Sequence, residues 1–330
     1  MADVWRFFSH EDDYADLAQD ELCARLGRAL SIRTVGGPTR EETDWAAFDE
    51  LEDLFRDSYP YVFESALVER IDHSLLLTLE GTNEDLDPVM LMGHMDVVCV
   101  VEGTESDWTH DAFSGYVDGE CVWGRGALDM KDQVVGELEA VEYALSHGWR
   151  LRRTIMLCFG QDEETFQSGA RALGRTLEER GIRLAFAVDE GDYRIVDTAP
   201  LGAPGHHGMY VGLAEKGYAD VRLTVRSPGG HSSNPFGGTS LAILARAIDR
   251  VASAPWPVEL IELERQALSA LAPHVSQDPL ASLVAGGRAS IDANAKRIAT
   301  LFLADRDLYP LVTTTVAPTM VEGGSQQANV

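Results

Sequence analysis

Short apolar segments alternate with amphipathic segments between residues 87 and 190, and this alternation restricts the fold more than any other feature of the sequence. Three apolar runs have the length and the branched or aromatic content of strands: PVMLMGHMDVVCVV, TIMLCFG and LAFAVDEG. Two runs between them have helical spacing: KDQVVGELEAVEYALSHG, with Gly148 as a stop signal, and FQSGARALGRTLEERG. We therefore predict an α/β domain built on a mainly parallel mixed sheet.

Further elements lie on both sides of this region. Helical spacing predicts four more helices, over residues 13–31, 44–56, 239–253 and 261–272. Apolar content predicts strands in YVFESALVE and SLLLTLEG, and β character resumes in LYPLVTTTVAPTMV. The hydrophobic pattern changes after about residue 215. There GYADVRLTVRSPGGHSS alternates apolar and polar residues, as a half-exposed strand does. We predict two domains, residues 1–215 and 216–330.

The chain of 330 residues carries a formal net charge of −27, and its acids are spread along its length. Such a surface disfavours nucleic acid and anionic membranes as partners, although a solvated acidic surface says little else about function. The N-terminus lacks the basic and apolar regions of a secretory signal, and no apolar run is long enough to span a bilayer. The four cysteines lack CxxC spacing. We expect a cytoplasmic protein.

Polar residues follow each of the three apolar runs where the predicted strand ends. Carboxyl ends of neighbouring parallel strands meet at one edge of a sheet, which is where α/β proteins bind ligands. A glycine-rich loop, WGRGALDMKD, adds another acid just before a predicted helix. The residues expected at this edge are His94, Asp96, Asp129, Glu163, Glu164, Asp189 and Glu190.

These acids have no local run of arginine or lysine to balance them, and the chain contains only three lysines. A divalent cation would relieve the repulsion, and one imidazole with several carboxylates suits zinc. Asp96 follows His94 by two residues and is placed to accept its second ring N–H. Neighbours at a strand end point in opposite directions, so one of Glu163 and Glu164 can bind metal while the other transfers protons. Asp162 is predicted to be a solvated turn residue.

Each of these residues also has a simpler interpretation. A single acid at a strand end is usually a surface or capping residue, and His94 alone is also a candidate for a satisfied core histidine. Recurrence at three successive strand ends favours a metal site. The lack of a closely spaced HExxH signature leaves both interpretations open.

Four motifs together resemble peptidase family M20: GHMDVV, WGRGALDMKD, GQDEE and SPGGHSS. The segments LAEKGYADVRLTVRSPGGHSSNP and TTTVAPTM are most similar to its carboxypeptidase S and N-acyl amino acid hydrolase branch. The resemblance implies a zinc-peptidase-like catalytic domain, which is interrupted by a smaller α/β lid domain that also mediates dimerisation.

The resemblance implies two zinc ions per subunit, with Co²⁺ and Mn²⁺ as alternatives. His94 and Asp189 would bind the first zinc, Glu164 the second, and Asp129 would bridge both. The Asp129–Met130 peptide is expected to be cis. The family takes its last zinc ligand, a histidine, from a segment near its C-terminus. Nothing here matches that residue, so we expect the chain to stop inside the lid.

The resemblance also implies the remaining roles at the site. Glu163 would be the general base and acid, and Asp96 would orient His94. His231 would reach the partner subunit's active site and stabilise the developing oxyanion, while Asn329 would help to hold substrate.

We therefore predict a dinuclear zinc hydrolase that cleaves an amide or peptide bond adjacent to a free carboxylate, through metal-activated water. Its substrate would be a small peptide or an N-acyl amino acid, which makes it a carboxypeptidase, dipeptidase or N-acyl amino acid amidohydrolase. It should form a homodimer through the lid. The alternative is a non-catalytic or inactive, truncated metal-binding dimerisation protein, which the unmatched final histidine favours.

Overall fold

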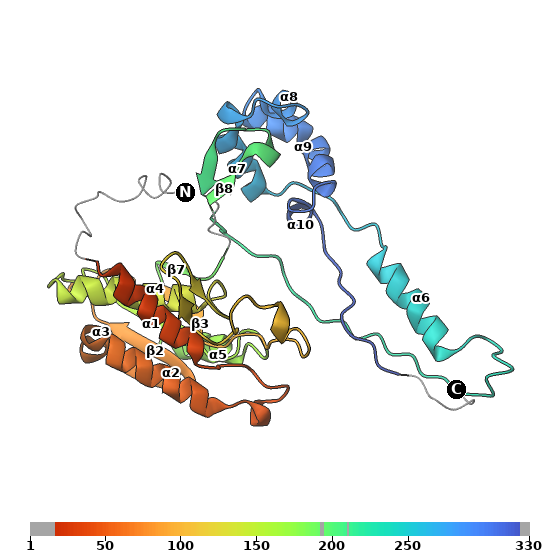
Figure 1. The fold of residues 1–330 in the computed structure, drawn as a ribbon. Helices are drawn as coiled ribbons and strands as arrows, with labels where there is room; N and C mark the ends of the chain where they lie inside the picture. Colours follow the sequence, from red (N-terminus) through yellow and green to blue (C-terminus); the bar gives the residue numbers. More distant parts are fainter. Residues whose placement is uncertain (1–16, 192–194, 210, 324–330) are drawn as a thin grey trace. The chain divides into compact units, whose positions relative to one another are not determined.

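The computed structural model describes residues 17–191, 195–209 and 211–323 (Figure 1). The chain divides into two compact units, Met1–Glu190 and Gly191–Val330. This division falls earlier than the boundary near residue 215 that the change in hydrophobic pattern predicts.

The first unit contains a five-stranded mixed sheet. Its strands, in spatial order, are β1 (Leu67–Ile71), β2 (Ser74–Leu79), β6 (Ile155–Gly160), β3 (Val89–His94) and β7 (Phe186–Val188). The pairs β1–β2 and β2–β6 are antiparallel, whereas β3 is parallel to both β6 and β7. The α/β class and the mixed sheet are thus confirmed, with the parallel pairing confined to three strands.

Helices pack on both faces of this sheet (Figure 1). They are α1 (Gln19–Ser31), α2 (Trp45–Ser58), α3 (Pro60–Ser65) and α4 (Lys131–Ser146) on one face, and α5 (Ser168–Glu179) on the other. Leu157 and Phe159 of β6 belong to the larger core, while Met156 and Cys158 pack with α5. The period of two along β6 therefore divides its apolar side chains between two cores. A short hairpin, β4 (Tyr116–Val117) and β5 (Val122–Trp123), completes the unit.

The segment YVFESALVE, predicted as one strand, consists of α3 followed by β1. Pro60 occupies the first turn of α3, where its fixed φ suits a helix. The backbone N–H groups of Tyr61 and Val62 donate to the Glu142 carboxylate, at 3.2 and 2.9 Å. These donors have no partner within the helix, so a carboxylate from α4 stabilises its start. Local apolar content does not reveal that contact.

The second unit contains a hairpin and five helices among its described residues. They are β8 (Ile195–Asp197), β9 (His207–Met209), α6 (Ser240–Ala252), α7 (Glu262–Leu271), α8 (Leu280–Val284), α9 (Arg288–Leu303) and α10 (Tyr309–Val312). Ile291 and Ile298 of α9 are fully buried against Leu268 and Leu283. Gly202, in the β8–β9 connection, accepts from the backbone N–H of Ser276. The hairpin therefore packs with this unit, which explains the early boundary.

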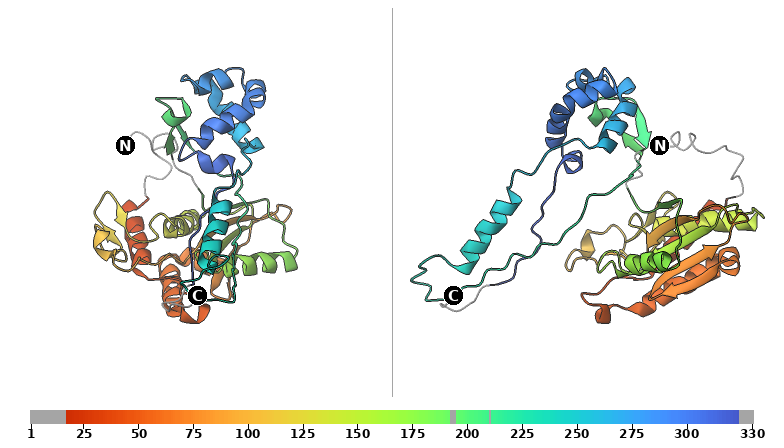
Figure 2. Two further views of the ribbon diagram at one scale, coloured as in Figure 1. Left: turned by 90° about the vertical axis from the view of Figure 1, so that its right-hand side faces the viewer. Right: turned by 180° about the vertical axis from the view of Figure 1, so that it is seen from behind.

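Two predicted β segments of the second unit do not pair into a sheet. Residues 211–230 form neither helix nor strand, and residues 314–323 are likewise irregular after α10. Figure 2 shows α6 flanked by extended chain. Alternation indicates which side chains share a face, but a strand also needs a neighbour for its ladder. Within the described part of the chain, no helix is both long and apolar enough to cross a membrane.

Replacing Leu157 with alanine should destabilise the first unit by about 2–5 kcal/mol, because a fully buried side chain in a central strand leaves a cavity. Urea denaturation followed by circular dichroism would measure the loss. Leu67→Ala is the matched control, because Leu67 lies on edge strand β1 and is largely exposed. Equal effects of the two substitutions would contradict the assignment of Leu157 to the core.

Candidate metal centre

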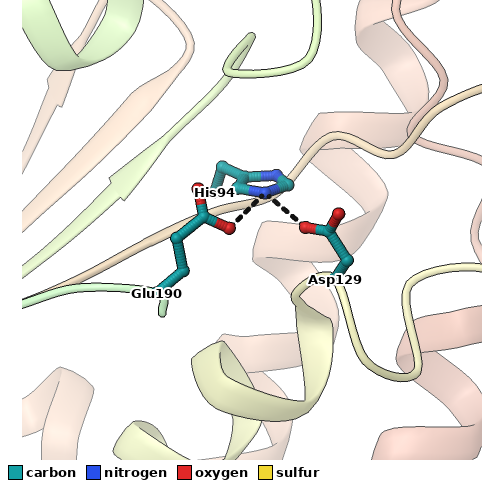
Figure 3. A group of neighbouring side chains, drawn as sticks. All are labelled: His94, Asp129 and Glu190. Carbon is teal, nitrogen blue, oxygen red and sulfur yellow. Dashed lines mark hydrogen bonds and ion pairs between the residues drawn. The ribbon is translucent and has the colours of Figure 1, made fainter. Parts of the chain in front are cut away.

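The parallel pairing of β3 with β6 sets the position of the central histidine. His94 is the last residue of β3 and lies opposite Gly160 of β6. Its ring is buried, with Nε2 3.0 Å from Asp129 Oδ1 and 3.4 Å from Glu190 Oε2 (Figure 3). On the other side, Nδ1 donates to the carbonyl oxygen of Asp96 at 2.9 Å. A carbonyl can only accept, so Nδ1 carries a proton and Nε2 is the nitrogen available to a metal.

Asp96 joins the end of β3 to the loop that follows β6. Its side chain is fully buried, and its two oxygens accept from the backbone N–H groups of Glu163 and Glu164, both at 3.0 Å. One of these oxygens also lies 3.3 Å from His94 Nδ1. A carboxylate that accepts two backbone N–H groups is held firmly. Asp96 therefore fixes the main chain of both glutamates as well as the histidine ring.

Asp162, predicted to be a solvated turn residue, is buried instead. Its carboxylate accepts from the Ser168 hydroxyl and from the Gly169 N–H, the latter at 2.7 Å. Both donors lie at the start of α5, where N–H groups lack helical partners. The prediction was wrong because a carboxylate that caps a helix is well satisfied without water. Of the three successive acids, the first anchors α5 and the other two remain for the site.

Asp129 projects from the loop before α4, and its side chain is 64% exposed. The Asp129–Met130 peptide is cis, as expected. Helix α4 approaches β3 closely, since a Cβ built on Gly93 would lie 2.7 Å from Val134 Cγ2 and 3.1 Å from Met130 Cε. A side chain at residue 93 would force Val134 to shift, so glycine permits the close contact that brings the loop of Asp129 next to the end of β3.

The side chains around His94 form two groups able to hold a metal. One is His94, Asp129 and Glu190, and the other is His94, Glu163 and Glu164; within each group the donor atoms lie within 4.8 Å of one another. An imidazole with carboxylates is a donor set that zinc accepts, and carboxylates can bridge two ions. The donor chemistry therefore fits one or two divalent cations.

Charge at the site follows from burial and from the contacts of His94. Burial lowers the pKa of His94, but its hydrogen bonds to Asp96 and Glu190 outweigh burial and raise the pKa to about 11. The bond to His94 lowers the pKa of Glu190. Burial, followed by the nearby negative charges, raises the pKa of Glu163, and burial with Asp129 raises that of Glu164 to about 6. The metal-free site thus holds an imidazolium among acids.

A family model for peptidase family M20/M25/M40 matches residues 90–304. The chain belongs to this family. It is 36% identical over 237 residues to the mouse N-fatty-acyl-amino acid synthase/hydrolase PM20D1, covering 70% of this chain and 46% of that protein. It is 34% identical over 247 residues to carboxypeptidase S of Saccharomyces cerevisiae, covering 71% and 42%. The chain spans about half the length of the curated relatives it matches.

The fold agrees with this membership. The structure of an M20 family metallo-carboxypeptidase from Sulfolobus solfataricus, Sso-CP2, matches with a TM-score of 0.54 and 19% identity. The match covers 87% of this chain and 64% of that one. The M20 fold that the sequence motifs predict is therefore confirmed.

The structure brings together most, but not all, of the predicted M20 site residues. His94, Asp96, Asp129, Glu163 and Glu164 converge as described above. Glu190, rather than Asp189, lies against His94 Nε2. Asp189 turns its Oδ1 to the backbone N–H of Glu190, at 2.8 Å. Its role as a ligand stays a prediction.

The two predicted residues from the lid are not tested by this geometry. His231 belongs to the second unit, where Nδ1 accepts from the Ser233 N–H at 3.2 Å and lies 2.8 Å from its hydroxyl. Asn329 lies outside the described residues.

Lys131 was not selected from the sequence, yet it is the first residue of α4 and follows Asp129 by two residues. Its side chain is 1% exposed, and burial lowers its pKa to about 7. Nζ donates to the carbonyls of Ala29 and Ile32, at 2.8 and 2.7 Å. A signal was present, because residue 131 shares a helical face with Val134 and Leu138.

Substitutions at residues 189 and 190 should identify the third M20 ligand. Glu190→Gln should lower zinc content more than Asp189→Asn, because Glu190 places an oxygen 3.4 Å from His94 Nε2, whereas Asp189 turns its Oδ1 to the Glu190 N–H. Atomic absorption on dialysed protein would measure zinc content. The reverse order would assign the ligand to Asp189, as the motifs imply.

Zinc binding should release more protons as the pH falls from about 7.5 to about 5.5. Glu164, with its pKa near 6, is ionised above this range and protonated below it, so a metal must displace its proton at the lower pH. Calorimetry in buffers of different ionisation enthalpy counts the protons released. Glu164→Gln should abolish the increase, and an unchanged proton count across the range would contradict binding through Glu164.

Proposed function

We propose that the chain is a dinuclear zinc hydrolase that cleaves an amide or peptide bond adjacent to a free carboxylate. The observation that carries this proposal is the convergence of His94, Asp129 and Glu190 with Glu163 and Glu164 at one sheet edge. Membership of family M20/M25/M40 supports the reaction class. The proposal covers carboxypeptidase, dipeptidase and N-acyl amino acid amidohydrolase activity.

In this proposal His94, Asp129 and a carboxylate of the Asp189–Glu190 pair hold one zinc ion. Asp129 and Glu164 hold a second. When bound, zinc acidifies water and polarises a carbonyl group. The donor set supports zinc, while Co²⁺ and Mn²⁺ remain alternatives that titration can compare.

Glu163 is the proposed proton carrier. It is partly buried, its pKa is raised first by burial and then by Glu190, and its Oε1 accepts from Gln167 Nε2 at 3.2 Å. A carboxyl group with a raised pKa takes a proton more readily at neutral pH and can return it to a leaving amine. Asp96 holds the Glu163 main chain, so this carboxylate starts from a fixed position.

The proposed substrate is a small peptide or an N-acyl amino acid. Similarity to the mouse N-fatty-acyl-amino acid synthase/hydrolase and to yeast carboxypeptidase S supports both classes. Leu128 directly precedes Asp129 and is 88% exposed, which offers an apolar contact beside the site. Contact with an acyl chain or an apolar side chain would cover it.

The remaining parts of the proposal rest on the sequence motifs. They are a catalytic role for the first unit, a lid role for the second and a homodimer through that lid. The proposed cytoplasmic location rests instead on the cysteine pattern. His231 would stabilise the oxyanion from the partner subunit, and Asn329 would hold substrate. The alternative is a metal-binding dimerisation protein without activity.

Glu163→Gln should lower amino-acid release by about 10²–10⁴-fold while zinc content stays unchanged, because it removes a proton carrier and not a ligand. Release from N-acyl amino acids and dipeptides would be measured beside atomic absorption. Glu164→Gln is the matched control and should lose zinc as well as activity. If Glu163→Gln loses as much zinc as Glu164→Gln, the two roles are exchanged. Zinc-loaded protein that releases no amino acid would favour the non-catalytic alternative.

A further inference from the structure

Two separate segments carry the central histidine and the proposed bridging aspartate. His94 is the last residue of β3 and Asp96 follows two residues later, whereas Asp129 lies 35 residues after His94, in the loop before α4. Both segments are bonded to the same third segment, residues 29–35, which comprises the end of α1 and the residues that follow it. We call residues 29–35 the brace.

The first attachment of the brace is to the chain on both sides of Asp96. Thr34 is fully buried, and its hydroxyl donates to the Met95 carbonyl at 2.6 Å. The Val97 N–H donates to the Thr34 carbonyl at 3.0 Å, and Val35 forms a parallel bridge with Val97. The brace therefore holds the residues immediately before and after Asp96.

The second attachment is to the loop that carries Asp129. The Lys131 ammonium donates to the carbonyls of Ala29 and Ile32. Carbonyls at the end of a helix lack helical partners, so a buried lysine satisfies them and suits the negative end of the helix dipole. The Lys131 N–H also donates to the Gly126 carbonyl at 2.9 Å, which closes the loop around Asp129.

The two attached segments contact each other at Gly126. Gly126 has a φ of +84°, and a Cβ built on it would lie 2.7 Å from Val97 Cγ1 and 3.4 Å from Lys131 Cγ. The Asp129 loop, the chain after Asp96 and the Lys131 stem are thus in direct contact. Moving the brace would move both attached segments.

We propose that Thr34 and Lys131 are positioning residues that act through the brace to set the separation between His94 Nε2 and Asp129 Oδ1, and so the affinity for the first metal ion. The inference rests on the proposed function in requiring a metal at these two residues. The two donor atoms lie 3.0 Å apart, and a site loosened by about 1 Å loses much of its function. Residues that orient metal ligands typically change affinity by about 10–100-fold when substituted.

The test is Co²⁺ titration of the full 330-residue chain, followed by visible absorption, with thermal denaturation of each metal-free variant. Thr34→Val and Lys131→Met should weaken Co²⁺ binding by about 10–100-fold and change the absorption spectrum, because the ligand geometry changes. Thr34→Ser keeps the hydroxyl and should bind Co²⁺ with the affinity and the absorption spectrum of the unsubstituted chain. Lys296→Met removes an ammonium from the second unit and should change neither.

Leu157→Ala separates positioning from general stability. It should lower the denaturation temperature while Co²⁺ affinity and spectrum stay unchanged, since Leu157 contributes to the core and not to the brace. Lys131→Met removes two buried hydrogen bonds and is the harsher change; if it fails to fold, the Thr34→Val and Thr34→Ser pair decides.

The proposal is overturned if Thr34→Val lowers stability but binds Co²⁺ with the same affinity and the same spectrum as the unsubstituted chain. A chain that binds no Co²⁺ would overturn the positioning role and the proposed function together. Binding without amide hydrolysis would contradict the proposed function alone, because the Co²⁺ spectrum reports on the brace without any turnover.

Discussion

The parallel pairing of β3 with β6 is the constraint on which the whole site depends. It sets His94 opposite Gly160, so the residues just beyond each strand meet at one edge. Asp96 can then accept the N–H groups of Glu163 and Glu164. A slip of one residue would turn His94 toward the other face of the sheet and break both bonds. Strand register therefore matters more for this site than any single carboxylate.

The carboxylates of the site remain close together because two kinds of hydrogen-bond donor offset their negative charges. Asp96 has backbone N–H donors, and Glu190 has the protonated His94, whose hydrogen bond lowers its pKa. Glu163 accepts from the neutral amide of Gln167, and burial raises the pKa values of both Glu163 and Glu164. A divalent cation that replaced the proton on His94 Nε2 would offset the negative charge of all these carboxylates at once. The protonated histidine therefore keeps the carboxylates close together until a metal binds.

The sequence predicted what depends on local pattern and missed what depends on a distant partner. Apolar periodicity and glycine stop signals predict the strands of the parallel region and helices α4 and α5. They also predict the cluster of polar residues at the strand ends. Helix α3 was missed because Glu142 of another helix stabilises its start. The choice between Asp189 and Glu190 depends on how the chain turns after β7, which no spacing specifies. The predicted β segments of the second unit have suitable alternation but form no ladder within the described residues.

The close approach of α4 to β3 at Gly93 has a consequence for directed evolution. Any side chain there would collide with Val134 and Met130, and Met130 adjoins Asp129. A library that varies this position would push α4 away from β3 and so disturb the loop that carries Asp129. Diversity is better introduced at Leu128, whose side chain points into solvent and can change without disturbing the contact of the two elements.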